Sequence, residues 1–377
     1  MKLVQAKKEK GSNWVFLDTK ETLIAPLVLV FGNRYMLEDS GIYKEIRTMF
    51  PGGNIVFGST SGEILANNVI ENSITITAIE FSKSHYKVCS QNISNYNNNI
   101  EELGEAITNK LLGKDLKHIF IMSEGSTING STLIKGLEHN IPVGVSITGG
   151  LSGDDARFER TLVSYNTNPK EGEVVAIGFY GASLEITYAN FGGWTGFGPE
   201  RIITKSTGNI LYELDNKPAL DLYKTYLGDK ADELPHAALF YPLKLTLKGT
   251  NESLVRTILN VNDKENTMTL AGDVPEGALV QLMMSTVDDI AEGASIAASY
   301  AMRGRKKEPE LSILISCIGR KLVMDQRVEE EVEEVIEIIG EKTKVTGFYS
   351  YGEMSPFAGE DNCVLQNQTM TLTLISE

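Results

Sequence analysis

Short apolar runs of strand length alternate with amphipathic runs of helix length along much of this chain. The first strand is predicted over residues 26–31, and the helix that follows it places Ile42, Ile46 and Met49 on one stripe. A second strand is predicted over residues 54–57. Strands that alternate with amphipathic helices along the chain are typical of an α/β protein.

The same order of elements occurs twice more. A helix lies between two predicted strands, at residues 118–122 and 143–147 in the second unit and at 312–317 and 345–350 in the third. Each unit ends in a loop of small residues that carries an acid, namely Glu63, Asp154 or Glu353. This spacing indicates an internal repeat of strand–helix–strand units, although such Gly/Ser loops also align by chance.

Residues 173–180 and 184–188 are further strand-like runs, joined by the small residues 181–183. A short connection that contains glycine predicts an antiparallel hairpin. We therefore expect mixed sheets, built from strand–helix–strand units and antiparallel hairpins and flanked by helices. The predicted fold class is α/β, with α+β as the alternative.

The length of 377 residues exceeds that of one ordinary domain, for which about 150 residues is a useful guide. A strand-rich region gives way to a helical stripe near residues 216–218. We expect an N-terminal extension over 1–24 and two fused regions over 25–216 and 217–377.

The charge excludes one class of partner. There are 35 Lys and Arg against 50 Asp and Glu, so the formal net charge is 35 − 50 = −15. A protein that binds nucleic acid needs clustered cations, and this chain offers one short basic run at residues 303–307. We expect no nucleic-acid partner.

The cysteines favour a reducing compartment, and the histidines and the hydropathy exclude other kinds of site and location. Three cysteines lie far apart, and four histidines lack the spacing of metal ligands, so no metal site is predicted. No nucleotide-binding motif appears, so no cofactor is expected. No apolar run is long enough for a secretion signal or a membrane span, which predicts a cytoplasmic protein without membrane insertion.

The three acid-bearing loops are the candidate ligand site. Arg34 and Arg320 follow the first strands of units one and three at matching positions. If these arginines share a cleft with the loop acids, the site suits a zwitterion, because guanidinium binds carboxylate and carboxylate binds ammonium. Alternatively, the charges pair with each other or face solvent. The other candidates in these loops are Ser59, Thr60, Gly149, Gly150, Asp155, Tyr349 and Ser350.

Cys317 lies at the end of a predicted buried strand, three residues before Arg320. A nearby cation lowers the pKa of a thiol and makes it reactive. The alternative is a small core residue, which is the commoner role of such a cysteine.

Three motifs resemble those of the FIST family, proposed sensory domains of signalling proteins. They lie at residues 57–64, at 149–155, and at 347–354 with 365–372. The resemblance implies amino- and carboxyl-terminal FIST domains, a small ligand, and amino acids as its class. Gly58 and Gln366 stand where the family pattern often has Cys and His, which weakens an enzymatic interpretation. Gln366 and its neighbour Asn367 remain candidates because amides still donate and accept hydrogen bonds.

The leading hypothesis is a cytoplasmic sensor that binds a small polar ligand. Because no output segment is recognised in the chain, its signal would pass to a separate signalling protein or through a homodimer. One alternative is a hydrolase or transferase that uses Cys317 or a loop serine. The other is an interaction scaffold that uses the acidic helix around residues 329–334.

Overall fold

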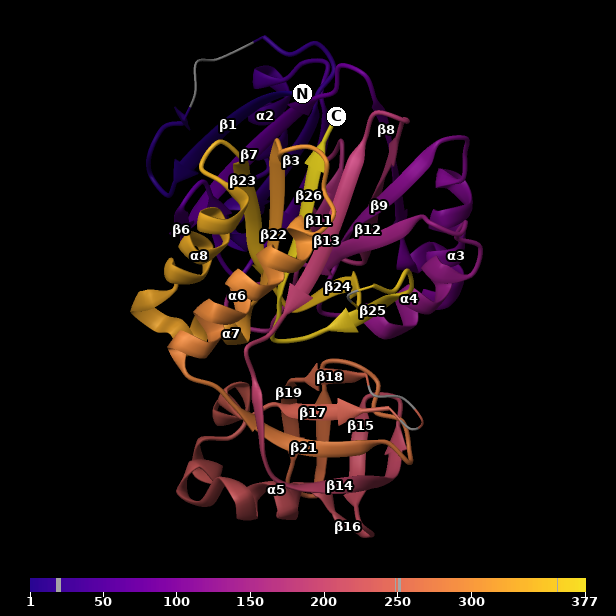
Figure 1. The fold of residues 1–377 in the computed structure, drawn as a ribbon, viewed down its shortest axis with the longest axis vertical. Helices are drawn as coiled ribbons and strands as arrows, with labels where there is room; N and C mark the ends of the chain where they lie inside the picture. Colours follow the sequence, from indigo (N-terminus) through magenta and orange to yellow (C-terminus); the bar gives the residue numbers. More distant parts are fainter. Residues whose placement is uncertain (18–21, 248, 250–251, 358) are drawn as a thin grey trace.

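The computed structural model describes residues 1–17, 22–247, 249, 252–357 and 359–377. Figure 1 shows a large body that contains both termini and a smaller β unit beneath it. The large body consists of three six-stranded sheets with helices on their outer faces. Within the described ranges, no helix has the length and apolar character needed to cross a bilayer.

Among the described residues, each sheet of the body contains one parallel pair of strands, and the other pairings are antiparallel. The first sheet contains, in spatial order, β11 (Val163–Tyr165), β4 (Asn54–Ser59), β3 (Leu27–Gly32), β7 (Ser73–Glu80), β1 (Lys2–Glu9) and β2 (Val15–Phe16). The second contains β25 (Cys363–Gln366), β24 (Gly352–Pro356), β10 (Ser146–Leu151), β9 (Leu116–Ser123), β12 (Glu173–Tyr180) and β8 (His85–Asn92). The third contains β13 (Glu185–Phe191), β26 (Met370–Ser376), β22 (Leu311–Cys317), β23 (Lys344–Ser350), β5 (Glu63–Leu65) and β6 (Asn68–Ile70).

The three sheets follow one plan, which confirms the repeat predicted from the sequence. The parallel pairs are β3 with β4, β9 with β10, and β22 with β23. The strand after each pair crosses to a neighbouring sheet, because β5 pairs with β23, β11 with β4, and β24 with β10. This cyclic exchange gives the body an approximate threefold arrangement and joins the three loops that precede the exchanged strands.

Two kinds of core explain why the central strands are apolar on both faces. Alternate residues, such as Leu29, Phe120 and Ile313, meet in a common core between the three sheets. The opposite faces pack against helices, and Val30 there contacts the cluster that includes Ile46. Strands buried on both faces read as near-continuous apolar runs, which is the pattern recognised in the sequence.

The helices cover the outer faces of the sheets. The first sheet carries α1 (Arg34–Leu37) and α2 (Ile42–Met49), the second carries α3 (Ile100–Leu111) and α4 (Gly130–Glu138), and the third carries α6 (Val287–Met302) and α8 (Glu330–Ile339). The helix α7 (Ile318–Met324) follows β22, and short 3-10 helices lie at Ile93–Tyr96, Gly228–Glu233, His236–Phe240 and Asp325–Arg327.

The smaller unit lies between β13 and α6 in the chain. Its sheet contains β18 (Ser253–Arg256), β17 (Leu243–Thr246), β21 (Leu279–Met284), β14 (Thr195–Thr207), β15 (Ile210–Leu214), β20 (Thr267–Leu270) and β19 (Ile258–Asn262), with β16 (Lys217–Pro218) beside β15. The helix α5 (Ala219–Leu227) packs on this sheet through its own apolar cluster. We call this segment the inserted unit.

The structure has the mixed α/β architecture expected from the sequence, with two errors in detail. The strand predicted over 143–147 lies at Ser146–Leu151, so Gly149 and Gly150 belong to a strand and not to a loop. Residues 173–180 and 184–188 do not form a hairpin: β12 pairs with β8 and β9, whereas β13 pairs with β26 of another sheet. The short turn therefore connects strands of two different sheets and not two adjacent strands of one sheet. Of the predicted extension over 1–24, β1 pairs with β7 along eight residues, and the expected boundary at 216/217 lies between β15 and β16.

Candidate functional site

The three acid-bearing loops meet at one place, which we call the three-loop junction (residues 59–63, 151–155 and 349–353). Backbone hydrogen bonds join the loops directly. The N–H of Ser61 donates to the carbonyl oxygen of Tyr349 over 2.8 Å, and the N–H of Gly153 donates to that of Ser59 over 3.0 Å. A third contact runs from the N–H of Tyr351 to the carbonyl oxygen of Leu151 over 3.2 Å. The loops therefore satisfy one another's backbone groups.

Glu63 lies buried at the junction. Its carboxylate accepts hydrogen bonds from the hydroxyls of Thr60, at 2.5 Å, and Ser73. Burial raises the pKa of Glu63 to about 7, against the opposing effect of these two hydroxyls.

Glu353 occupies the matching position in unit three. It accepts hydrogen bonds from the hydroxyl of Ser350 at 2.6 Å and from the hydroxyl and N–H of Thr369 at 3.0 and 3.1 Å. Burial raises the pKa of Glu353 to about 7 as well. Both acids are thus engaged within the fold.

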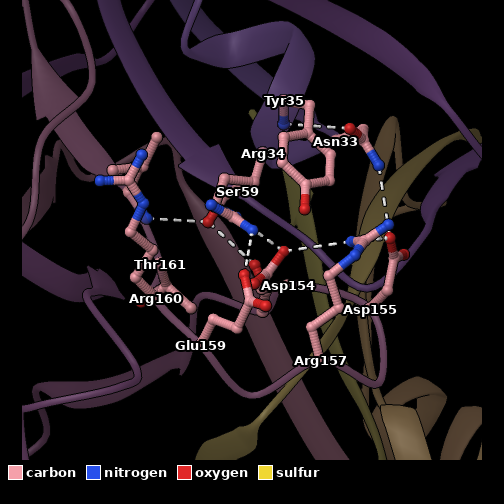
Figure 2. A network of polar contacts seen from close by, with 12 residues as sticks. Asn33, Arg34, Tyr35, Ser59, Asp154, Asp155, Arg157, Glu159, Arg160 and Thr161 are labelled. Carbon is pink, nitrogen blue, oxygen red and sulfur yellow. Dashed lines mark hydrogen bonds and ion pairs between the residues drawn. The ribbon is translucent and has the colours of Figure 1, made fainter.

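Arg34 and Asp154 form the centre of a charged network (Figure 2). Nε of Arg34 donates to Oδ1 of Asp154 over 2.9 Å, and its other nitrogens donate to Glu38 and Glu159. Burial alone would lower the pKa of Arg34, but the bond to Asp154 and the nearby carboxylates raise it above its usual value. Asp155 lies beside this group, where Oδ2 accepts from Arg157 over 2.5 Å.

Arg320 belongs to a separate network. Its guanidinium lies 2.8 Å from Oε2 of Glu331 on α8, with both side chains fully buried. It also donates to the carbonyl oxygens of Gly192 and Ile290. The hydroxyl of Tyr349 donates to Oε1 of Glu331 over 2.5 Å, and burial raises the pKa of Tyr349. The two predicted arginines therefore do not share a cleft.

The remaining predicted residues are buried. Cys317 is 3% exposed, and burial raises the pKa of its thiol well above the usual range. A Cβ on Gly149 would lie 2.1 Å from the carbonyl oxygen of Ile121, so this glycine permits close strand packing. Gly150 packs similarly against Ile315. The Nδ2 group of Asn367 donates to the carbonyl oxygen of its neighbour Gln366 over 2.8 Å.

An open cleft lies beside the three-loop junction, between the body and the inserted unit. Its volume is about 480 Å³, which lies within the range of small-molecule sites. The body contributes the loop at residues 125–130, Leu151 and the rings of Phe158 and Tyr351, and the inserted unit contributes Asn209, Leu259, Asn260, Leu270 and Ala271. No charged side chain is among the described residues that line it. None of the fifteen predicted residues lines it either.

Local interactions fix the body wall of this cleft. The carboxylate of Glu124, which follows β9, accepts hydrogen bonds from the N–H groups of Ser126 and Thr127 at 2.6 and 2.9 Å. Asn129 caps α4 by accepting from the N–H of Thr132 at 3.0 Å. The rings of Phe158 and Tyr351 stack with their centroids 4.6 Å apart. The wall is therefore held in place by contacts within the protein.

The sequence contains a signal for this wall that lies outside the three acid-bearing loops. Residues 123–130 are small or polar apart from Ile128, and they follow the first strand of unit two. Arg34 and Arg320 follow the first strands of the other two units at the corresponding position. Ligands of open α/β sheets bind beyond the carboxyl ends of the strands. Of the predicted residues, Asp155 alone lines another hollow among those we describe, of about 390 Å³, together with Arg157 and Lys321.

Comparisons with known proteins agree with this description. A model of the FIST N domain matches residues 26–217, and a model of the FIST C domain matches residues 219–356. An uncharacterized protein of Methanocaldococcus jannaschii is 25% identical over 253 residues, which cover 61% of this chain and 45% of that protein. The chain thus spans less than half the length of this relative. FIST domains are sensory domains associated with signal transduction. The chain belongs to the FIST family.

Proposed function

We propose that this protein is a cytoplasmic sensor that binds a small polar metabolite in the cleft between the body and the inserted unit. The observation that carries the proposal is the cleft itself, since its two walls come from separately packed units. Ligand sites occur preferentially at such boundaries. Amino acids are the first ligand class to test.

The lining favours a ligand whose own charges cancel. Because no charged side chain is among the described lining residues, a net ion would remain unbalanced in the cleft. Gly130 lines the cleft at the start of α4, and its N–H group lacks an acceptor within the helix and suits a carboxylate. The stacked rings of Phe158 and Tyr351 offer an apolar surface for the remainder of a zwitterionic amino acid.

Binding across two units supplies a physical basis for signalling. A ligand that contacts both walls stabilises the conformation in which they lie close together, and this difference in affinity shifts the population. We propose that the shifted conformation is recognised by a separate signalling protein or changes homodimer formation.

Neither alternative function has a comparable feature. A reactive thiolate needs a lowered pKa, whereas burial raises the pKa of Cys317. The hydroxyl of the loop serine Ser59 donates to the carbonyl oxygen of Gly153 and accepts from the N–H of Leu162. The acidic helix α8 uses Glu331 to pair with Arg320.

The test is a thermal-shift screen of the twenty protein amino acids, followed by calorimetric titration of each that raises the melting temperature. A ligand at 100 times its Kd stabilises the folded state by about 2.7 kcal/mol. Ala271→Trp fills the cleft and is expected to abolish the shift. Asn262→Ala, on the same inserted unit but outside the cleft, is the control. A screen without any shift, or a shift that survives Ala271→Trp, contradicts the proposal.

A further inference from the structure

A second hollow also lies between the body and the inserted unit. Its volume is about 650 Å³, and it is bounded by α4 and β25 of the body and by β14, β17 and β18 of the inserted unit. Its walls are largely apolar, with contributions from Ile134, Leu245, Leu254, Val274 and Leu365. This composition is typical of a site for a ligand with an apolar body.

A buried guanidinium belongs to this hollow. Arg256 is 4% exposed and lines it. Its hydrogen bonds go to neutral acceptors, the carbonyl oxygens of Asp273, Val255 and Leu365, at 3.2, 3.1 and 2.9 Å. Across the residues that the structure describes, Arg256 forms no ion pair with a carboxylate. A buried cation without an anionic partner is costly, because carbonyl groups replace only part of its hydration.

Two further observations concern the charge of Arg256 and the space around its side chain. Burial lowers the pKa of Arg256 to about 10, against the weak opposing charge of Asp273. A Cβ on Gly272 would lie 3.1 Å from Nε and Cζ of Arg256, so a glycine leaves the space that this side chain occupies. The chain therefore places a cation against an apolar hollow and keeps room for it there.

We propose that this hollow binds an amphipathic monocarboxylate, such as a medium-chain fatty acid. The carboxylate meets the guanidinium of Arg256, and the hydrocarbon chain lies against the leucine and valine side chains. A ligand with one carboxylate matches the guanidinium of Arg256, whereas Asp273 and Glu276, which also line the hollow, would repel a second carboxylate. Lys135 at its rim already pairs with Asp273 over 3.2 Å.

This site goes beyond the sensor proposed above, because it lies in a different hollow with different chemistry. Both hollows span the same two units, so an occupant of either one stabilises their contact. The two proposals remain separable, because each hollow has its own blocking substitution.

The test uses octanoate as the probe, with octanol and acetate as matched compounds. Octanol retains the chain without the charge, and acetate retains the charge without the chain. Calorimetric titration is expected to show octanoate binding about tenfold or more tightly than either. Arg256→Gln is expected to weaken octanoate by about the same factor and to leave octanol unchanged. Octanoate that binds no better than octanol, or that binds folded Arg256→Gln equally well, overturns the proposal.

A second variant covers the case in which Arg256→Gln fails to fold. Ser206→Trp fills the hollow from β14 and is expected to remove octanoate binding. Thr207→Trp is the matched control, since successive residues of a strand face opposite sides and Thr207 is not among the lining residues. Equal effects of the two tryptophans contradict the site. Ala271→Trp, which blocks the other cleft, is expected to leave octanoate binding intact.

Discussion

Arg34 and Asp154 lie 120 positions apart in the chain, yet Nε of one donates to Oδ1 of the other over 2.9 Å. Their side chains are 5% and 0% exposed. Arg34 follows β3 of the first sheet and Asp154 follows β10 of the second. The pair therefore joins the first and second sheets at the three-loop junction (Figure 2).

Removal of the cation should be strongly destabilising. In Arg34→Met, Asp154 keeps its buried charge but loses its closest partner, and the free energy of unfolding is expected to fall by about 3–5 kcal/mol. Urea unfolding of Arg34→Met, Asp154→Leu and the double variant measures the coupling. The double variant is expected to be more stable than the sum of the two single losses predicts, because neither member of the buried pair is left without the other.

Arg160→Met is the control for this experiment. The side chain of Arg160 is 46% exposed and pairs with Glu38 and Glu171. Exposed pairs contribute at most about 1 kcal/mol. A loss in Arg34→Met no larger than that in Arg160→Met would show that the buried pair is not important for stability.

The two junction glutamates predict a stability that depends on pH. In the folded protein the pKa of Glu63 and of Glu353 is about 7, above the usual value of 4.5. Their contribution is full below about pH 4.5 and is lost as pH rises to about 7, because only the unfolded chain ionises readily in that range. Urea unfolding of wild type, Glu63→Gln and Glu353→Gln at several pH values measures the difference.

Each glutamine variant is expected to lose less stability than wild type as pH rises through this window. The comparison between wild type and variant isolates one group, since other groups titrate in the same range. Parallel pH profiles for all three proteins would mean that neither carboxyl has a raised pKa.

Buried His118 predicts the opposite dependence of stability on pH, a loss of stability as the pH falls. Burial lowers the pKa of His118 from 6.5 to about 3, and its ring nitrogens lie 2.8 Å from the hydroxyls of Ser146 and Thr148. Its contribution is present above about pH 6.5 and is lost as pH falls toward 3, because the unfolded imidazole binds the proton first. The loss is at most about 1.4 kcal/mol per pH unit.

NMR measures this prediction directly. The imidazole carbon-bound proton of His118, assigned by its disappearance in His118→Gln, is expected to keep one chemical shift between about pH 5 and 8. An inflection in that range would show that the ring is protonated inside the fold.

The cysteines are expected to be unreactive in the folded protein. Cys89, Cys317 and Cys363 are free and buried, and burial raises the pKa of each thiol. An aromatic disulfide reagent at neutral pH should label them only after denaturant is added. Fast labelling of wild type that disappears in Cys317→Ser would revive the enzymatic alternative.

The local pattern was sufficient for the repeated units of the fold. The runs at 26–31, 118–122 and 312–317 became the strands β3, β9 and β22, because strands buried on both faces must be apolar throughout. The hairpin predicted at residues 181–183 was wrong, since a short connection looks the same whether the next strand joins the same sheet or an adjacent layer. Strand partners depend on contacts that no local pattern records.

At the site, some features were determined by the amino-acid sequence and others were decided only by the tertiary structure. The sequence determined that three similar loops carry Glu63, Asp154 and Glu353. The tertiary structure decided that the backbone groups of these loops form hydrogen bonds with one another. It also decided that the open cleft lies between residues 125–130 and the inserted unit. Which buried polar groups pair, and where a hollow remains, follows from close packing between segments far apart in the chain.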